Sequence, residues 1–121
     1  MKIKSLLINK TENKCFHCEV NGKYIDNEIQ YIDNDVEVTI KIMDEVLVIR
    51  RHCLEYTIEI NLSLNQSLVG KYMVKQLGEL SLRSEANKME IKPNLITCEY
   101  DLILDEQERI NFEFILEYSE E

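Results

Sequence analysis

Alternation of apolar and polar residues is the feature that most constrains the fold of this chain. From Leu54 to Leu62 every even position is apolar and every odd position is polar. Residues 36–42 repeat this pattern, and residues 110–118 largely follow it. A period of two puts successive side chains on opposite faces of a strand, so these runs predict strands with one buried face. We therefore expect Ile58 and Ile60 to point inward.

Turn-forming residues separate the alternating runs. Asn21-Gly22 is the strongest hairpin signal, and shorter turns are expected at 33–35, 43–45, 92–94 and 105–108. The best helix candidate, 84–92, is short and is closed by Pro93, so we expect a strand that bends or breaks near 85–87. The chain then divides into strands at roughly 2–9, 15–20, 23–32, 36–43, 45–51, 54–62, 67–75, 79–90, 95–104 and 109–119.

Successive strands joined by short turns form a meander. A meander of about eight to ten strands usually curls and closes, because closure removes the exposed edges. The sequence therefore predicts an all-β, antiparallel, up-and-down barrel, with a two-sheet sandwich as the alternative. The length of 121 residues suits a single domain, 1–121.

The composition narrows the function classes. The chain has 23 acidic and 14 basic residues and a formal charge of −9, whereas nucleic-acid binding needs Lys and Arg for phosphate contacts. No apolar run approaches the ~20 residues of a membrane-spanning helix, and Met1–Asn9 becomes polar too quickly for a secretory signal. We expect a cytoplasmic protein without nucleic-acid or membrane partners, and four free thiols in a reducing environment.

Four segments in the second half carry a resemblance to a known family. Residues Glu45–Arg50, Gly78–Leu82, Tyr100–Leu102 and Asn111–Tyr118 occur in an order and spacing that resemble the YwiB-like proteins, a group of small, uncharacterised bacterial proteins. The resemblance covers roughly residues 36–118. It implies a calycin-like, lipocalin-type β-barrel. It implies no activity, catalytic residue or cofactor, because the family has none assigned.

Cys15-Phe16-His17-Cys18 is the segment that most resembles a metal or redox motif. With His52 or Cys53 it could complete a tetrahedral zinc set. Residues three apart in a strand point to opposite faces, however, so Cys15 and His17 would share one face and Cys18 would lie on the other. We therefore expect no metal. Cys18 and Cys98 are expected to be small core residues.

Aromatic residues fall on the apolar face of their own strands. Buried tyrosine hydroxyls need partners, so these rings either fill the core or line a partly polar cavity. Tyr56, Tyr72, Tyr100 and Tyr118 lie on different predicted strands and are expected to converge when the sheet closes. The full set is Phe16, Tyr31, Tyr56, Tyr72, Tyr100, Phe112, Phe114 and Tyr118.

Arg50-Arg51-His52 is the only local concentration of positive charge. It is either a solvated turn or an anchor for an anion or a carboxylate at the barrel mouth. Together with the tyrosines, Arg50 and Arg51 complete the predicted ligand site.

Three functions remain open. The first is a non-catalytic binding module whose barrel holds a small, largely apolar ligand, with no cofactor. The second is a protein-interaction or regulatory domain that uses its acidic outer surface. The third and weakest is an enzyme. A cysteine–histidine nucleophile would need a positioned base, and His52 and Cys53 are adjacent in a predicted turn, where neighbouring side chains diverge.

Overall fold

Ten β-strands account for the regular secondary structure of the described residues. The computed structural model describes residues 1–104 and 108–119, so most of the turn expected at 105–108 lies outside the described residues. The strands are β1 (Lys2–Asn9), β2 (Lys14–Ile25), β3 (Glu28–Asp33), β4 (Val36–Met43), β5 (Val46–His52), β6 (Tyr56–Leu62), β7 (Ser67–Val74), β8 (Gly78–Lys92), β9 (Leu95–Ile103) and β10 (Arg109–Ser119).

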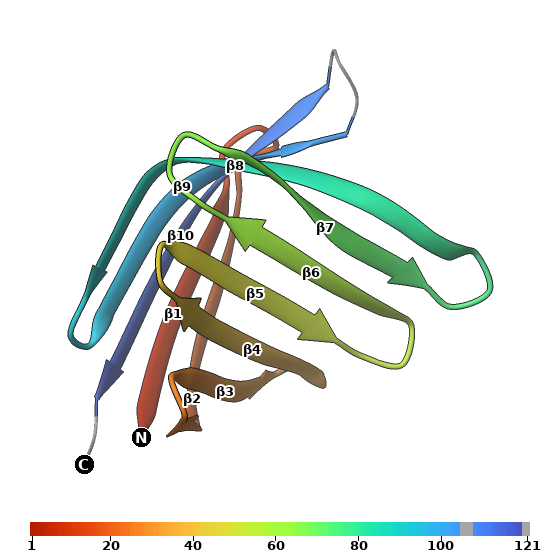
Figure 1. Cartoon of the computed structure of the whole chain (residues 1–121). Helices are drawn as coiled ribbons and strands as arrows, with labels where there is room; N and C mark the ends of the chain where they lie inside the picture. Colours follow the sequence, from red (N-terminus) through yellow and green to blue (C-terminus); the bar gives the residue numbers. More distant parts are fainter. Residues whose placement is uncertain (105–107, 120–121) are drawn as a thin grey trace.

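The strands close into one antiparallel barrel in which each strand pairs with its neighbours in sequence (Figure 1). β1 closes the ring by pairing with β2 on one side and with β10 on the other. The start of β1 and the end of β10 lie at the same end of the barrel, because Lys2 pairs with Ser119. The predicted up-and-down barrel is confirmed, and the closed ring excludes the alternative two-sheet sandwich.

The hairpin predicted at Asn21-Gly22 is wrong. Both residues lie inside β2, and the turn between β2 and β3 is made by Asp26 and Asn27, whose φ angles are 54° and 63°. Two consecutive positive φ angles are what a type I′ hairpin requires. Gly22 serves a different purpose, since a Cβ there would lie 2.5 Å from the carbonyl oxygen of Gln30. The glycine allows β2 to leave β1 and pair closely with β3.

The segment 84–92 forms part of β8 and not a helix. A β-bulge between Ala86 and Lys88 shifts the pairing with β9, which confirms the bend expected at 85–87. The extra residue, Asn87, changes the inward positions from even numbers before the bulge to odd numbers after it. After the bulge the apolar residues of β8 fall on odd-numbered positions, and the bulge lets them, such as Met89, still face the interior.

The interior is an apolar core to which most strands contribute fully buried side chains. Ile60 is buried and Ile58 packs against the core, so the inward register predicted for β6 is confirmed. Burying each such aliphatic side chain contributes about 1.5–3 kcal/mol. The large side chains with the least exposure are Ile3, Ile29, Ile40, Leu47, Leu62, Ile96 and Leu116.

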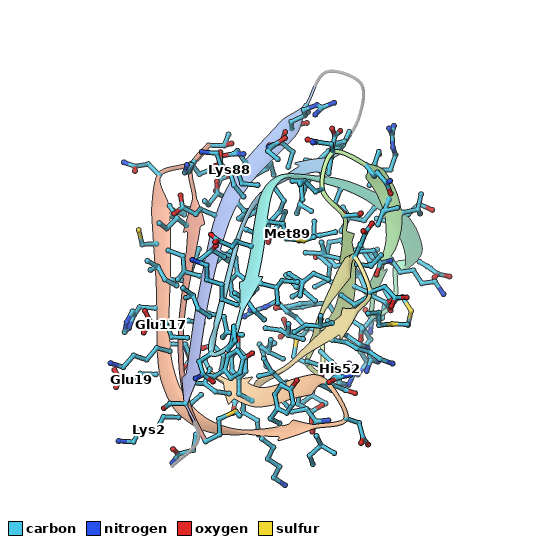
Figure 2. All side chains as sticks on the ribbon, turned by 60° about the vertical axis from the view of Figure 1, so that its left-hand side comes forward. Lys2, Glu19, His52, Lys88, Met89 and Glu117 are labelled. Carbon is cyan, nitrogen blue, oxygen red and sulfur yellow. The ribbon has the colours of Figure 1, made fainter. Side chains whose placement is uncertain are left out.

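Charged residues occupy the outer face of the barrel. Figure 2 shows Lys2, Glu19 and Glu117 pointing away from the wall formed by β1, β2 and β10. Ion pairs across this surface, such as that between Lys4 Nζ and Glu19 Oε1 at 4.0 Å, are solvent-exposed. Exposed pairs of this kind stabilise little. Across residues 1–104 and 108–119, no helix is long and apolar enough to cross a membrane.

Candidate functional site

The four tyrosines of the predicted ligand site do not form one cluster. Tyr56 and Tyr72 meet edge to face with ring centroids 6.2 Å apart. The other two stack on different rings, Tyr100 on Phe112 at 5.4 Å and Tyr118 on Tyr24 at 6.0 Å. The predicted convergence fails because the rings stand at different heights along the barrel. Tyr118 of β10 pairs with Ile3 at the start of β1. Phe112 of β10, on which Tyr100 stacks, pairs with Asn9 at the end of β1.

Arg50 and Arg51 point to opposite sides of the barrel wall. Arg50 is exposed and lies opposite Glu59 on the outer face. Arg51 lies opposite Val38 and Ile58, whose side chains pack in the interior. Of the two arginines proposed as an anchor, only Arg51 therefore reaches the barrel interior.

The Cys15–Cys18 segment behaves as strand geometry predicts. Cys15 is exposed and Cys18 is buried, so the two thiols lie on opposite faces of β2, and Cys98 is buried in the core. All four cysteines are free. Among the residues that the structure describes, no three Cys, His, Asp or Glu side chains gather in a way that could hold a metal ion. His52 Nδ1 instead lies 2.6 Å from the hydroxyl of Thr57.

Five inward-facing side chains from four strands form a polar cluster inside the otherwise apolar barrel: Ser5, Cys18, Tyr31, Asp33 and Arg51. Arg51 Nη2 donates a hydrogen bond to Asp33 Oδ2 at 3.4 Å, and both side chains are partly buried. The Cys18 thiol lies beside Asp33 and Ser5. Burial raises the pKa of Cys18 most, the negative Asp33 raises it further, and Ser5 and Arg51 oppose the shift. The thiol therefore remains protonated at neutral pH.

Tyr31 carries the most unusual polar atom of this cluster. Its side chain is 4% exposed, and among the described residues its buried hydroxyl has no partner within hydrogen-bond distance, although the Ser5 hydroxyl lies near it. Burial raises the pKa of Tyr31 to about 12, against the opposing effects of Ser5 and the positive Arg51. The phenol is therefore neutral at physiological pH and keeps its O–H donor, for which residues 1–104 and 108–119 place no acceptor within hydrogen-bond distance. Such atoms are rare in folded proteins and call for an explanation.

Arg51 is the second group with unused donors. In the part of the chain that the structure describes, its side chain makes one hydrogen bond, to Asp33. A guanidinium carries several N–H donors in a planar fork, so most of them have no protein acceptor. Tyr100 lies near enough for Arg51 to oppose the rise in pKa that burial and Cys98 impose on its phenol. Of the four predicted tyrosines, Tyr100 is thus the one that the structure links electrostatically to this cluster.

A cleft of about 450 Å³ opens onto the polar cluster. The cleft lies beside the first half of β2. β2 pairs with β3 only from Gly22 to Ile25, so the residues of β2 before Gly22 have no hydrogen-bonded neighbour in β3. Four apolar side chains form its walls and three polar side chains of the cluster lie within it. The lining residues are Ser5, Leu7, Phe16, Asp33, Val36, Arg51 and Phe114, with Cys15, His17 and Asn34.

The volume of the cleft and its mixed apolar and polar lining lie within the ranges seen for small-molecule sites. Such sites have volumes of roughly 300–1,000 Å³, apolar walls and a few polar groups that orient the ligand. Phe16 contributes to this character, because it pairs with Leu7 on the inward face yet remains 54% exposed. An aromatic side chain that faces inward and still contacts solvent is available to a ligand.

Sequence reasoning missed most of this site. Tyr31 and Phe16 were predicted to face inward but were not assigned to a ligand. Asp33 was assigned only to a turn. It lies two residues after Tyr31 and four after Ile29, both buried, so alternation along β3 puts it on the same inward face. Strand parity could therefore have placed Asp33 inside the barrel. The apposition of Asp33 with Arg51 depends on tertiary pairing and leaves no signal in the sequence.

Comparison with known proteins places the fold. A scan against protein-family profiles finds no match, and neither does a search of curated proteins. Among solved structures, the crystal structure of the ywiB protein from Bacillus subtilis matches with a TM-score of 0.68. It is 15% identical in sequence, and the match covers 98% of this chain and 89% of that one. The resemblance to the YwiB-like proteins drawn from the sequence is therefore confirmed at the level of the fold.

Proposed function

We propose that this protein is a non-catalytic binding module that holds a small, largely apolar molecule in the cleft between β2 and the β3–β4 turn. The observation that carries the proposal is Arg51, which lines the cleft and donates only one side-chain hydrogen bond among the described residues. The Tyr31 hydroxyl, buried in the same polar cluster, also has no partner within hydrogen-bond distance there. A calycin-like barrel, which the resemblance implies, suits this use because its interior can accommodate one small ligand.

Energetics support a ligand more than a purely structural role. Leaving a buried donor without an acceptor costs about 1–3 kcal/mol, a substantial part of the stability of a small domain. A core selected only for stability would hold Phe in place of Tyr31 and an aliphatic side chain in place of Arg51. Apolar walls on Leu7, Phe16 and Val36 then supply most of the contact surface for a bound tail.

The chemistry of the cleft favours binding over catalysis. The buried thiol beside it, Cys18, has a raised pKa and is a poor nucleophile in that state. Asp33 forms an ion pair with Arg51. Its carboxylate is therefore already engaged by the guanidinium and is not positioned as a free base. The groups present can orient a polar head group without activating it.

Titration with octanoate tests the proposal. In two-dimensional NMR of ¹⁵N-labelled protein, octanoate should shift amide signals around Leu7, Phe16 and Val36. Phe16→Ala should weaken octanoate binding about fivefold, since roughly half of an aromatic side chain's burial, about 1 kcal/mol, is lost. Because Phe16 is half exposed already, the domain should remain folded.

Ile32→Ala is the matched control, because Ile32 is 60% exposed but lies outside the residues that line this cleft. This variant should bind octanoate as the wild type does. Shifts spread evenly over the barrel surface, or equal effects of the two variants, would show that the cleft is not the binding site.

A further inference from the structure

The polar cluster has more donors than acceptors. Tyr31 has an unsatisfied hydroxyl, and Arg51 has several N–H groups without a protein acceptor among the described residues. Asp33 is the one carboxylate among the residues that line the cleft, and its bond to Arg51 is long for a charged pair at 3.4 Å. Charge-assisted bonds of good geometry are about 2.7–2.9 Å long. Asp33 therefore satisfies only part of the hydrogen-bonding capacity of the Arg51 guanidinium.

We propose that the cleft selects amphipathic carboxylic acids, bound as carboxylates that accept hydrogen bonds from Arg51 in place of Asp33. This inference rests on the proposed binding function and adds the chemical class of the ligand. A carboxylate fits because its two oxygens can accept two parallel N–H bonds from one guanidinium. The apolar tail would lie along Leu7, Phe16 and Val36.

In this arrangement the Asp33 carboxylate competes with the carboxylate of the ligand for the guanidinium of Arg51. It occupies the last position of β3, immediately before a turn in which Asn34 and Asp35 both have positive φ angles. A side chain at a strand end can change rotamer without disturbing the ladder. Once displaced from Arg51, the Asp33 carboxylate would be free to turn towards the Tyr31 hydroxyl, since Asp33 is one of the electrostatic neighbours of that phenol. Binding of the acid would thus give Tyr31 the acceptor that it lacks.

The net charge of −9 does not prevent anion binding at this position. Physiological salt screens exposed charges beyond about 8 Å, whereas a partly buried cation in the cleft is screened much less. Arg51 is therefore the dominant charge that a ligand head group meets once it is inside. Asp33 is the dominant opposing charge, and it sets the affinity.

Three probes with the same tail and different head groups test the inference on the wild-type protein: octanoate, 1-octanol and octylamine. Octanoate should bind at least about tenfold more tightly than 1-octanol, the ratio expected for hydrogen bonds to a charged group. Octylamine should bind most weakly, because it meets Arg51. Dissociation constants from NMR titration at neutral pH give the ranking.

Asp33→Asn provides the second measurement, because it removes the competing charge and keeps the shape of the side chain. It should tighten octanoate binding about fivefold and leave 1-octanol binding unchanged. The paired variant Asp33→Asn/Arg51→Gln leaves no buried charge unpaired and should abolish the preference for octanoate over 1-octanol. If Arg51→Gln alone fails to fold, the paired variant still supplies this result.

The outcomes separate the two proposals. If 1-octanol binds in the cleft as tightly as octanoate, or if Asp33→Asn weakens octanoate binding, the carboxylate assignment is wrong while the binding cleft stands. Tightest binding of octylamine would overturn the assignment in the same way and would make Asp33 the recognition group. If none of the three probes shifts the signals of the cleft residues, both proposals fail.

Discussion

Replacing Tyr31 with Phe should make the domain more stable. The change keeps the aromatic ring in its buried position and removes only a hydroxyl that has no partner within hydrogen-bond distance in the described part of the chain. An unsatisfied buried polar group costs about 1–3 kcal/mol, so Tyr31→Phe should raise the free energy of unfolding by about 1 kcal/mol or more. At this chain length, about 1 kcal/mol corresponds to roughly 4 °C in the melting temperature.

Urea unfolding followed by circular dichroism measures the effect. The midpoint should rise while the m-value stays constant, which identifies a change in stability and not in the unfolded state. Tyr24→Phe is the control, because the exposed Tyr24 hydroxyl donates to Asn27 Oδ1 at 3.3 Å. Its stability should change by less than about 0.5 kcal/mol. A loss of about 1 kcal/mol in Tyr31→Phe would refute the reasoning, since it would show that the hydroxyl is bonded in the folded protein.

Gly70→Ala should destabilise the domain by about 2–3 kcal/mol in the same urea assay, because a Cβ there collides with a backbone carbonyl of β6. Gly78→Ala, in open space but at a φ of 92°, should cost only about 1–2 kcal/mol, and the reverse order would contradict this packing. Ile60→Asp should abolish folding, as read by circular dichroism, while Thr57→Asp should be mild; equal tolerance would overturn the β6 register. Burial raises the pKa of Cys98 from 9.0 to about 12, so the unfolded chain loses this proton first. Stability should therefore fall as the pH rises from 9 towards 12, and Cys98→Ala should lessen that fall; an unchanged pH profile in the variant would rule the thiol out as its cause.

The class of the fold was predictable because its determinants are local. Alternation from Tyr56 to Leu62 fixes which side chains of β6 face the core, and short turns between such runs impose antiparallel neighbours. The strand predicted over 54–62 is too long at its start, because Leu54 precedes β6 and is 91% exposed. The turn at Asn21-Gly22 was predicted wrongly for an instructive reason. Glycine relieves steric conflict both in a turn and where two backbones approach closely, and sequence alone does not distinguish these uses.

The site was only partly predictable, because alternation gives the face of a residue and not its height along the barrel. Parity alone places Arg51 and Tyr100 inside, and it would have placed Asp33 there as well. Which inward residues meet depends on the stagger between paired strands, which sums over the whole ring. That stagger separates Tyr118 from Tyr100 and brings Arg51 to Asp33, 18 positions away in sequence. The sequence by itself thus determined a closed β-barrel with an apolar interior. Only the tertiary structure decided where in that interior polar side chains gather, because it alone sets the register between strands.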